Sequence, residues 1–113
     1  ASLRRTAMMA LRDDIFKLDD LTIDTVNCSV LINNLPLHLT PIEFKLLFIL
    51  AKKPGKVFTH RQLLSEVWGA EYVDDTHYLR IHMGRLRARV EKTPAAPRYL
   101  LTEVGIGYRL AAT

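Results

Sequence analysis

Two helix-start signals that follow each other closely limit the folds open to this chain. In "LTPIEFKLL", which begins at residue 39, Thr40 is suited to be an N-cap and Glu43, three residues later, completes a capping box. Thr59 and Gln62 repeat the pattern in "FTHRQLL". A "PG" pair stops the first helix after residue 53, and Gly69 is placed to end the second. The sequence therefore predicts two consecutive helices, over about residues 41–53 and 60–68.

A third helix is predicted in "THYLRIHMGRLRARVEK", residues 76–92, with Asp75 or Thr76 as its N-cap. Its apolar residues recur at the 4-3-4 spacing of a buried helical face. The remaining surface is basic or hydrogen-bonding, and no acidic residue lies between Asp75 and Glu91. Solvated helices usually alternate acidic and basic residues at i,i+4, so this pattern favours a surface for an acidic partner. The residues predicted to be buried are Leu79, Met83, Leu86 and Val90.

The distribution of charge supports this interpretation. The net charge is +4, but residues 76–113 alone hold seven Lys or Arg against two acidic residues, a net of +5. Residues 1–40 and 41–75 have net charges of −1 and zero. A concentrated basic region attracts polyanions, although such a region is often only a solvated face.

The two ends of the chain are predicted to contain strands. Short apolar runs broken by "DD" and "NN" predict an antiparallel sheet of three or four strands in residues 15–39, with Cys28 as a small apolar residue in a strand. Residues 1–14 show no sustained periodicity and are interpreted as a linker. Near the C-terminus, strands over residues 99–103 and 108–110 flank a turn that Gly105 and Gly107 permit. A hairpin after a basic helix is typical of a wing, which contacts a neighbouring groove or phosphate strand.

Duplex DNA is the acidic partner that the third helix fits best. Arg85 points outward at mid-helix, where its guanidinium can bond guanine O6 and N7, and exposed Ile81 suits a thymine methyl group. Other polar groups are candidates for phosphate contacts, although Tyr78 and the histidines also fit ordinary packed or surface positions. Arg109, on the wing, fits equally well as a partner of the domain body. The phosphate candidates are His77, Tyr78, His82, Arg87 and Arg89 on the helix, and Thr102 and Tyr108 on the wing.

Other classes of function find little support in the sequence. No His-x-x-x-His pair, cysteine pair or glycine-rich phosphate loop is present, so we expect no metal, no cofactor and no enzymatic activity. The single cysteine favours a reducing, cytoplasmic location, and no apolar run reaches the roughly 20 residues of a membrane span. The alternative function is a protein–protein interaction module whose basic helix binds an acidic partner.

Four segments in this order, "LTPIEFKLL", "LLSEVWG", "HYLRIHMGRLR" and "TEVGIGYRL", resemble the effector domain of OmpR/PhoB-type response regulators over residues 15–110. The resemblance implies an α+β fold, a winged helix-turn-helix with an N-terminal four-stranded antiparallel sheet, three helices and a C-terminal β-hairpin wing. It also implies that residues 15–113 form the DNA-binding effector domain and that residues 1–14 are the end of a receiver domain with its linker. Within the family, the third-helix and wing segments are most similar to regulators of potassium transport.

The resemblance further implies partners. These are duplex DNA with direct-repeat half-sites, a second protomer bound head-to-tail, and a sensor kinase that acts on an upstream receiver domain. Many relatives have arginine in place of Val104 and Gly84 and an acidic residue in place of Arg80, so we expect a different base preference. The loop between the second and third helices is implied to contact RNA polymerase. It comprises Gly69, Ala70, Glu71, Tyr72, Val73, Asp74 and Asp75.

Overall fold

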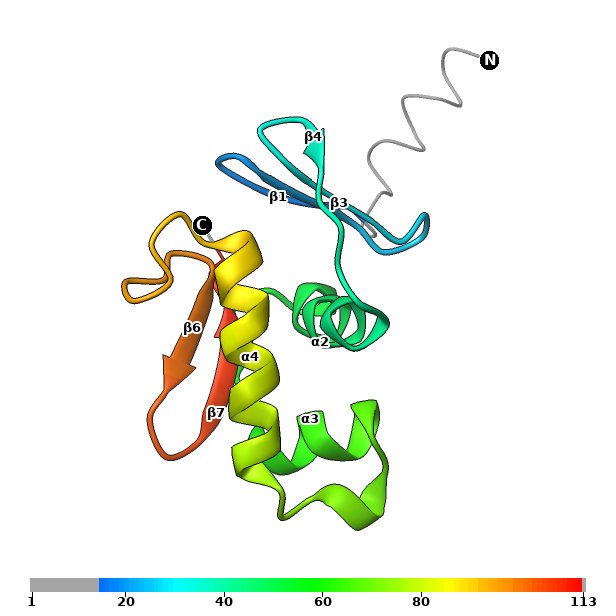
Figure 1. Ribbon diagram of the computed structural model, residues 1–113, viewed down its shortest axis with the longest axis vertical. Helices are drawn as coiled ribbons and strands as arrows, with labels where there is room; N and C mark the ends of the chain where they lie inside the picture. The colour runs from blue at the N-terminus through cyan, green and yellow to red at the C-terminus, as the bar shows by residue number, and fades with distance from the viewer. Residues whose placement is uncertain (1–14, 113) are drawn as a thin grey trace.

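The computed structural model describes residues 15–112, which begin with a four-stranded antiparallel sheet of order β1-β2-β3-β4 (Figure 1). Left-handed backbone at Asp19, Asn33 and Asn34 turns the chain between these strands, as the "DD" and "NN" pairs predicted. The predicted linker, residues 1–14, lies outside the described residues. The strands are β1 (Ile15–Leu18), β2 (Leu21–Asp24), β3 (Ser29–Ile32) and β4 (Leu35–Pro36).

The prediction that Cys28 lies in a strand was wrong. Cys28 is exposed, has a φ of 53°, and belongs to the turn between β2 and β3. The turn forms there because one carboxylate oxygen of Asp24 accepts the backbone N–H groups of Val26 and Asn27, each at 3.0 Å. This side chain ends β2 before the "TVNC" run can continue it.

Both predicted capping boxes are present. Helix α2 (Pro41–Lys52) begins at Thr40, whose hydroxyl accepts the N–H of Glu43 at 3.2 Å, while the Glu43 carboxylate accepts the N–H of Thr40 at 2.9 Å. Helix α3 (His60–Val67) begins at Thr59, which exchanges the equivalent pair of bonds with Gln62. The chain leaves α3 at Gly69, whose φ of 124° is unfavourable for other residues. Sequence and structure therefore agree on where these helices begin.

The C-terminal sheet has one strand more than was predicted. Strands β6 (Leu100–Glu103) and β7 (Gly107–Leu110) form the expected hairpin around Gly105, whose φ is 77°. A two-residue strand, β5 (Phe58–Thr59), pairs with the other edge of β7 and gives the order β5-β7-β6. Gly107 lies in the strand rather than the turn, where a Cβ atom would overlap the backbone carbonyl oxygen of Phe58. Glycine is needed at 107 for close strand approach.

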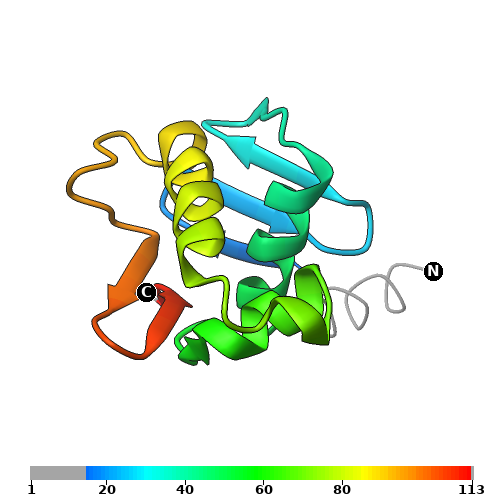
Figure 2. The same ribbon diagram turned by 60° about the horizontal axis from the view of Figure 1, so that its bottom comes forward.

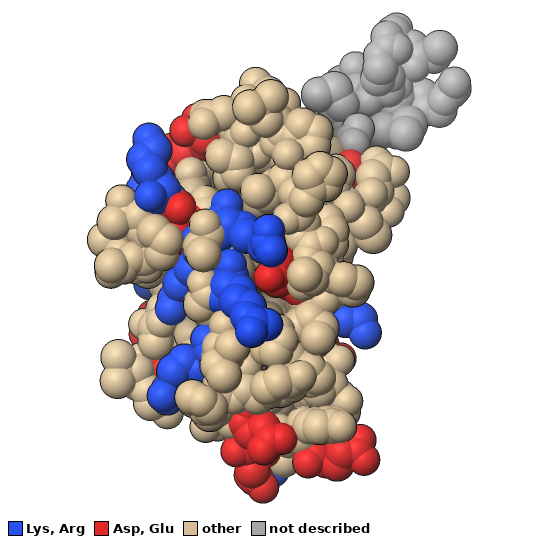
Figure 3. Space-filling view, viewed as in Figure 1, with Lys and Arg blue, Asp and Glu red and all other residues tan. Residues whose placement is uncertain are grey.

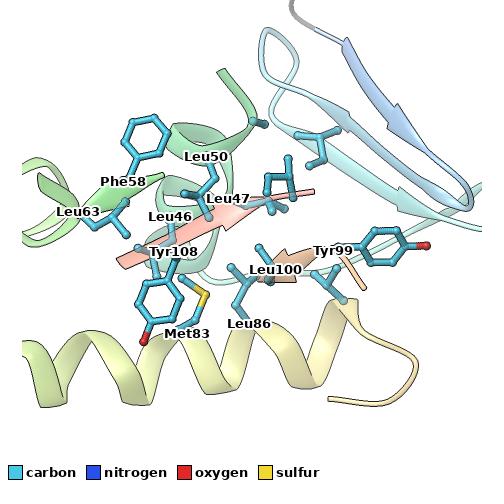
Figure 4. Close-up of a cluster of buried hydrophobic side chains, with 14 of the residues drawn as sticks. Leu46, Leu47, Leu50, Phe58, Leu63, Met83, Leu86, Tyr99, Leu100 and Tyr108 are labelled. Atoms are coloured by element: carbon cyan, nitrogen blue, oxygen red, sulfur yellow. The ribbon is translucent and has the colours of Figure 1, made fainter. Parts of the chain in front are cut away.

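Helix α4 (Thr76–Val90) crosses the centre of the molecule, with the β6–β7 hairpin on one side and α2 and α3 on the other (Figures 1 and 2). The four residues predicted to be buried, hereafter the buried row of α4, are at most 4% exposed. They pack against leucines of α2 and α3 and against the C-terminal strands, so the core holds the helix by one face (Figure 4). No helix of residues 15–112 is long and apolar enough to span a membrane.

Candidate nucleic-acid interface

The face of α4 opposite the buried row is open to solvent. At about 100° per residue, Ile81 and Ala88 point most directly away from the core. Ile81 is 39% exposed, as predicted for a residue that contacts a partner. No other element of residues 15–112 covers this face. The exposed residues there are His77, Arg80, Ile81, Gly84, Arg85 and Ala88.

Two guanidinium groups on this face are free. Within the described residues, neither Arg80 nor Arg85 has a hydrogen-bond or ion-pair partner, and both are exposed. They lie on opposite sides of Ile81 around the helix. Figure 3 shows basic side chains gathered over α4, with acidic side chains at the end of the molecule where the chain passes from α3 to α4. The face therefore combines unpartnered cationic side chains with an apolar centre.

Arg89 was predicted to contact phosphate, and the structure places it against the start of α2. Its Nε atom lies 3.0 Å from a carboxylate oxygen of Glu43, which is only 2% exposed. A second nitrogen donates to the backbone oxygen of His38 at 3.4 Å. The guanidinium remains exposed beside a cleft of about 560 Å³ between α2 and α4 that Arg85 also lines. Arg89 thus connects the two helices and still faces solvent.

Arg87, the other predicted phosphate contact, is turned toward the wing. Its Nε and one terminal nitrogen donate to the backbone oxygen of Leu100 at 3.1 and 2.8 Å. The same terminal nitrogen donates to the hydroxyl of Thr102 at 2.6 Å, and the guanidinium lies over the ring of Tyr108. Arg87 therefore fastens α4 to the hairpin. Thr102 remains exposed, but its hydroxyl is already engaged.

Two other predicted contact residues are buried in the domain. Tyr108 is 4% exposed and packs in the core, because it faces α4 from the inner side of β7. His82 is 8% exposed, with Nδ1 3.0 Å from the backbone oxygen of Tyr78. The ring of Trp68 covers it at a centroid distance of 5.1 Å. Tyr78 lies against the same indole at 5.0 Å but remains 41% exposed.

Trp68 contributes to the site although it was not among the predicted contact residues. Its indole N–H is buried and has no acceptor among the described residues, which is unusual for a buried tryptophan. It closes α3 and joins Tyr78 and His82 in an aromatic cluster that links α3 to the start of α4. The sequence signal was present, because Tyr78 and His82 are spaced i,i+4 on one helix.

The wing ends in apolar side chains. Val104 is 90% exposed and Ile106 is 54% exposed at the β6–β7 turn. Arg109 does not pair with the domain body; its Nε lies 2.6 Å from a carboxylate oxygen of Glu103 on the neighbouring strand. The tip therefore presents apolar groups and no free cation of its own.

The predicted polymerase-contact loop is partly ordered by a short 3₁₀-helix, η1 (Ala70–Tyr72). Asp74 is 3.0 Å from Arg61 of α3, in an exposed ion pair. Asp75 occupies the N-cap position of α4, as expected, but its side chain caps no backbone N–H. Tyr72 is 39% exposed and lines a hollow of about 540 Å³ with Trp68 and Tyr78. The loop therefore offers aromatic and acidic groups together.

These features define a winged helix-turn-helix DNA-binding domain. Residues 15–112 contain no group of three or more His, Cys, Asp or Glu residues close enough to hold a metal ion. The chain belongs to the family described as "Transcriptional regulatory protein, C terminal", which matches residues 34–110. It is the DNA-binding domain of an OmpR/PhoB-type two-component response regulator, and this family is not enzymatic.

Individual proteins support the assignment. The chain is 47% identical to the KDP operon transcriptional regulatory protein KdpE of Escherichia coli K12, over 96% of this chain and 48% of KdpE. It therefore spans about half the length of the curated relatives that it matches. The structure of the OmpR/PhoB homologue DrrB of Thermotoga maritima is similar, with a TM-score of 0.71 and 31% identity over 87% of this chain and 44% of DrrB. The Klebsiella pneumoniae RstA DNA-binding domain in complex with the RstA box gives a TM-score of 0.78 and 25% identity, over 88% of this chain and 98% of that one.

Proposed function

We propose that the domain recognises a specific duplex DNA sequence by placing the exposed face of α4 in the major groove. The observation that carries the proposal is the pair of unpartnered guanidinium groups, Arg80 and Arg85, on either side of exposed Ile81. Arginine bonds guanine O6 and N7 in a bidentate manner, and an apolar side chain suits a thymine methyl group. The RstA domain crystallised with the RstA box has the same fold, which supports this function for α4.

The exposure and partners of each side chain guide the proposed contacts. Arg85 and Ile81 remain candidates for base edges, joined by Arg80. His77, Tyr78 and Arg89 are exposed and remain candidates for phosphate contacts. Thr102 can still reach a phosphate from the wing while Arg87 holds it. Arg87, His82 and Tyr108 are better explained as supports of α4 and the wing, because their polar atoms or rings are engaged inside the domain.

Selection of bound sequences from a random duplex pool tests the proposal directly. The wild-type domain should enrich a defined motif. Arg85→Ala should weaken binding to that motif by about 1–3 kcal/mol and relax the preference at one position. Ser65→Ala, an exposed change on α3 outside the proposed face, is the control and should leave binding unchanged. Equal losses on selected and random duplexes would remove the base-reading role of Arg85.

The biological setting is also a proposal, because the chain covers only about half of its relatives. The 47% identity with the KDP operon regulator supports control of a potassium-transport operon. We further propose a cytoplasmic protein with an upstream receiver that a sensor kinase phosphorylates, and a second protomer bound head-to-tail on direct-repeat half-sites. Deleting the gene in its source organism and measuring potassium-transport transcripts at low potassium tests the target. Unchanged transcripts would reject it.

A contact with RNA polymerase is proposed for the loop over residues 69–75. Its exposed Tyr72 and the hollow beside Trp68 support a docking role, and its acidic groups would repel DNA rather than bind it. Tyr72→Ala in the full-length regulator should reduce activated transcription and leave the affinity for promoter DNA unchanged. A parallel loss of DNA affinity would show that the loop serves DNA binding instead.

A further inference from the structure

The domain itself does not explain why residue 84 is glycine. Gly84 lies in the interior of α4 and is exposed. Glycine is unfavourable within a helix, because it loses more backbone freedom on folding than alanine does. A Cβ atom at this position would meet no atom within 4 Å, and the residue does not have the positive φ that favours glycine. Neither packing nor backbone conformation among residues 15–112 therefore requires glycine here.

The position of Gly84 on α4 places it within the proposed DNA interface. It is within about 50° of the direction that points directly away from the buried row of α4. Ile81 and Ala88 lie on the same outward side, one turn before and one turn after it. The free guanidinium groups of Arg80 and Arg85 lie on its two flanks. Gly84 thus lies on the outward side of α4 between Ile81 and Ala88, in the part of the proposed interface that faces the groove.

The dimensions of the groove make a side chain at this position important. The major groove of B-DNA is about 12 Å wide, and an α-helix with its side chains is about 10–12 Å across. The helix therefore enters with little clearance, and a side chain added at 84, beside that of Ile81, would hold this flank of the backbone farther from the bases. Since an arginine side chain has a fixed reach, the depth of the helix decides whether its guanidinium bonds a base edge or stops at a phosphate.

We propose that Gly84 is a specificity-determining residue: its lack of a side chain lets α4 lie deep enough for Arg80 and Arg85 to reach base edges. The inference rests on the proposed function, since it presupposes that α4 enters the major groove. Complexes with random DNA depend mainly on phosphate contacts, so the depth of α4 affects them much less. Glycine at 84 would then lower the stability of the free domain while increasing its selectivity.

The test is a pair of substitutions of increasing size, Gly84→Ala and Gly84→Leu, measured by thermal unfolding and by titration with the selected duplex and a random duplex. Both residues favour helix more than glycine does, and the Cβ atom that each adds meets no neighbouring atom, so both variants should fold. Gly84→Ala should raise Tm by about 4 °C or more. Affinity for the selected duplex should fall about tenfold with alanine and further with leucine, while affinity for the random duplex changes less than about twofold. Ser65→Ala, which improves helix propensity away from the interface, should change neither affinity.

Each result bears on the proposal. Undiminished affinity of Gly84→Ala and Gly84→Leu for the selected duplex would overturn it. Equal losses for alanine and leucine would also overturn it, because they would point to a need for helix flexibility rather than for depth. If the wild-type domain selects no sequence, the proposed function itself fails, and that outcome is separate because it is seen before any substitution is made.

Discussion

Two arginines that lie two positions apart on α4 have different surroundings. Arg85 is free, whereas Arg87 donates to Leu100 and Thr102 of the wing. We predict that Arg87→Ala lowers the free energy of unfolding by about 1–3 kcal/mol, because the carbonyl of buried Leu100 loses charged donors. The salt dependence of DNA binding should keep its slope, since no phosphate contact is lost. Chemical denaturation and titration at several salt concentrations measure the two quantities.

Arg87→Lys is the matched control for this prediction. It keeps the charge but not the fork that bonds Leu100 and Thr102 together, so it should recover only part of the lost stability. An unchanged unfolding free energy combined with a salt slope reduced by about one would instead return Arg87 to the phosphate role.

At the level of single residues, the sequence predicted which side chains are buried better than which are free. Helical periodicity placed the buried row of α4 correctly, because burial of one face follows from local spacing. The engagement of Arg87 depends on β6 and the burial of Tyr108 depends on α4, and in each case the partner lies more than ten residues away along the chain. Periodicity contains no information about such distant partners.

The helices and strands were predictable where their own residues contain a local signal, such as a capping box or a turn pair. The capping boxes fixed the starts of α2 and α3, and turn residues fixed most of the N-terminal sheet. Strand β5 was missed because two residues show no alternation, and the strand exists only through pairing with β7. The turn at Cys28 was missed because it depends on the side chain of Asp24 rather than on glycine or proline.

The pairing of β5 with β7 should be sensitive to one methyl group. Gly107→Ala would place a Cβ atom on the carbonyl of Phe58, so we predict a loss of about 3 kcal/mol in unfolding free energy as these strands separate. Gly105→Ala is the comparison, since it meets no neighbour and bears only the cost of a positive φ, about 1–2 kcal/mol. Denaturant titration measures both. A smaller effect at 107 than at 105 would contradict the close approach of β5.

The segment that joins α4 to β6 depends on one buried carboxylate. Glu91 is 6% exposed and accepts the backbone N–H groups of Arg98, Tyr99 and Leu100 at 2.8–3.3 Å. Glu91→Ala leaves these donors without an acceptor, so we predict a loss of about 3 kcal/mol or more in unfolding free energy. Glu91→Gln retains one acceptor oxygen and should lose less than half as much. Equal losses would show that shape, rather than hydrogen bonding, is what Glu91 contributes.

Across the whole molecule, positive charge covers α4 while the acidic loop lies at one end, so a polyanion can approach along a single face (Figure 3). If that polyanion is duplex DNA, binding releases counterions, and two to four neutralised phosphates give a slope of about −2 to −4 for log Kobs against log salt concentration. Between 50 and 200 mM salt the affinity should then fall by between about tenfold and several hundredfold.

Ile81→Ala should lower the affinity for the selected duplex without changing this slope, because an apolar contact releases no ion, whereas Arg89→Ala should reduce the slope by about one. If the partner is instead an acidic protein, the domain should show no measurable duplex binding even at 50 mM salt. Fluorescence anisotropy titrations of the three proteins at four salt concentrations separate a DNA-reading face from one that is only basic.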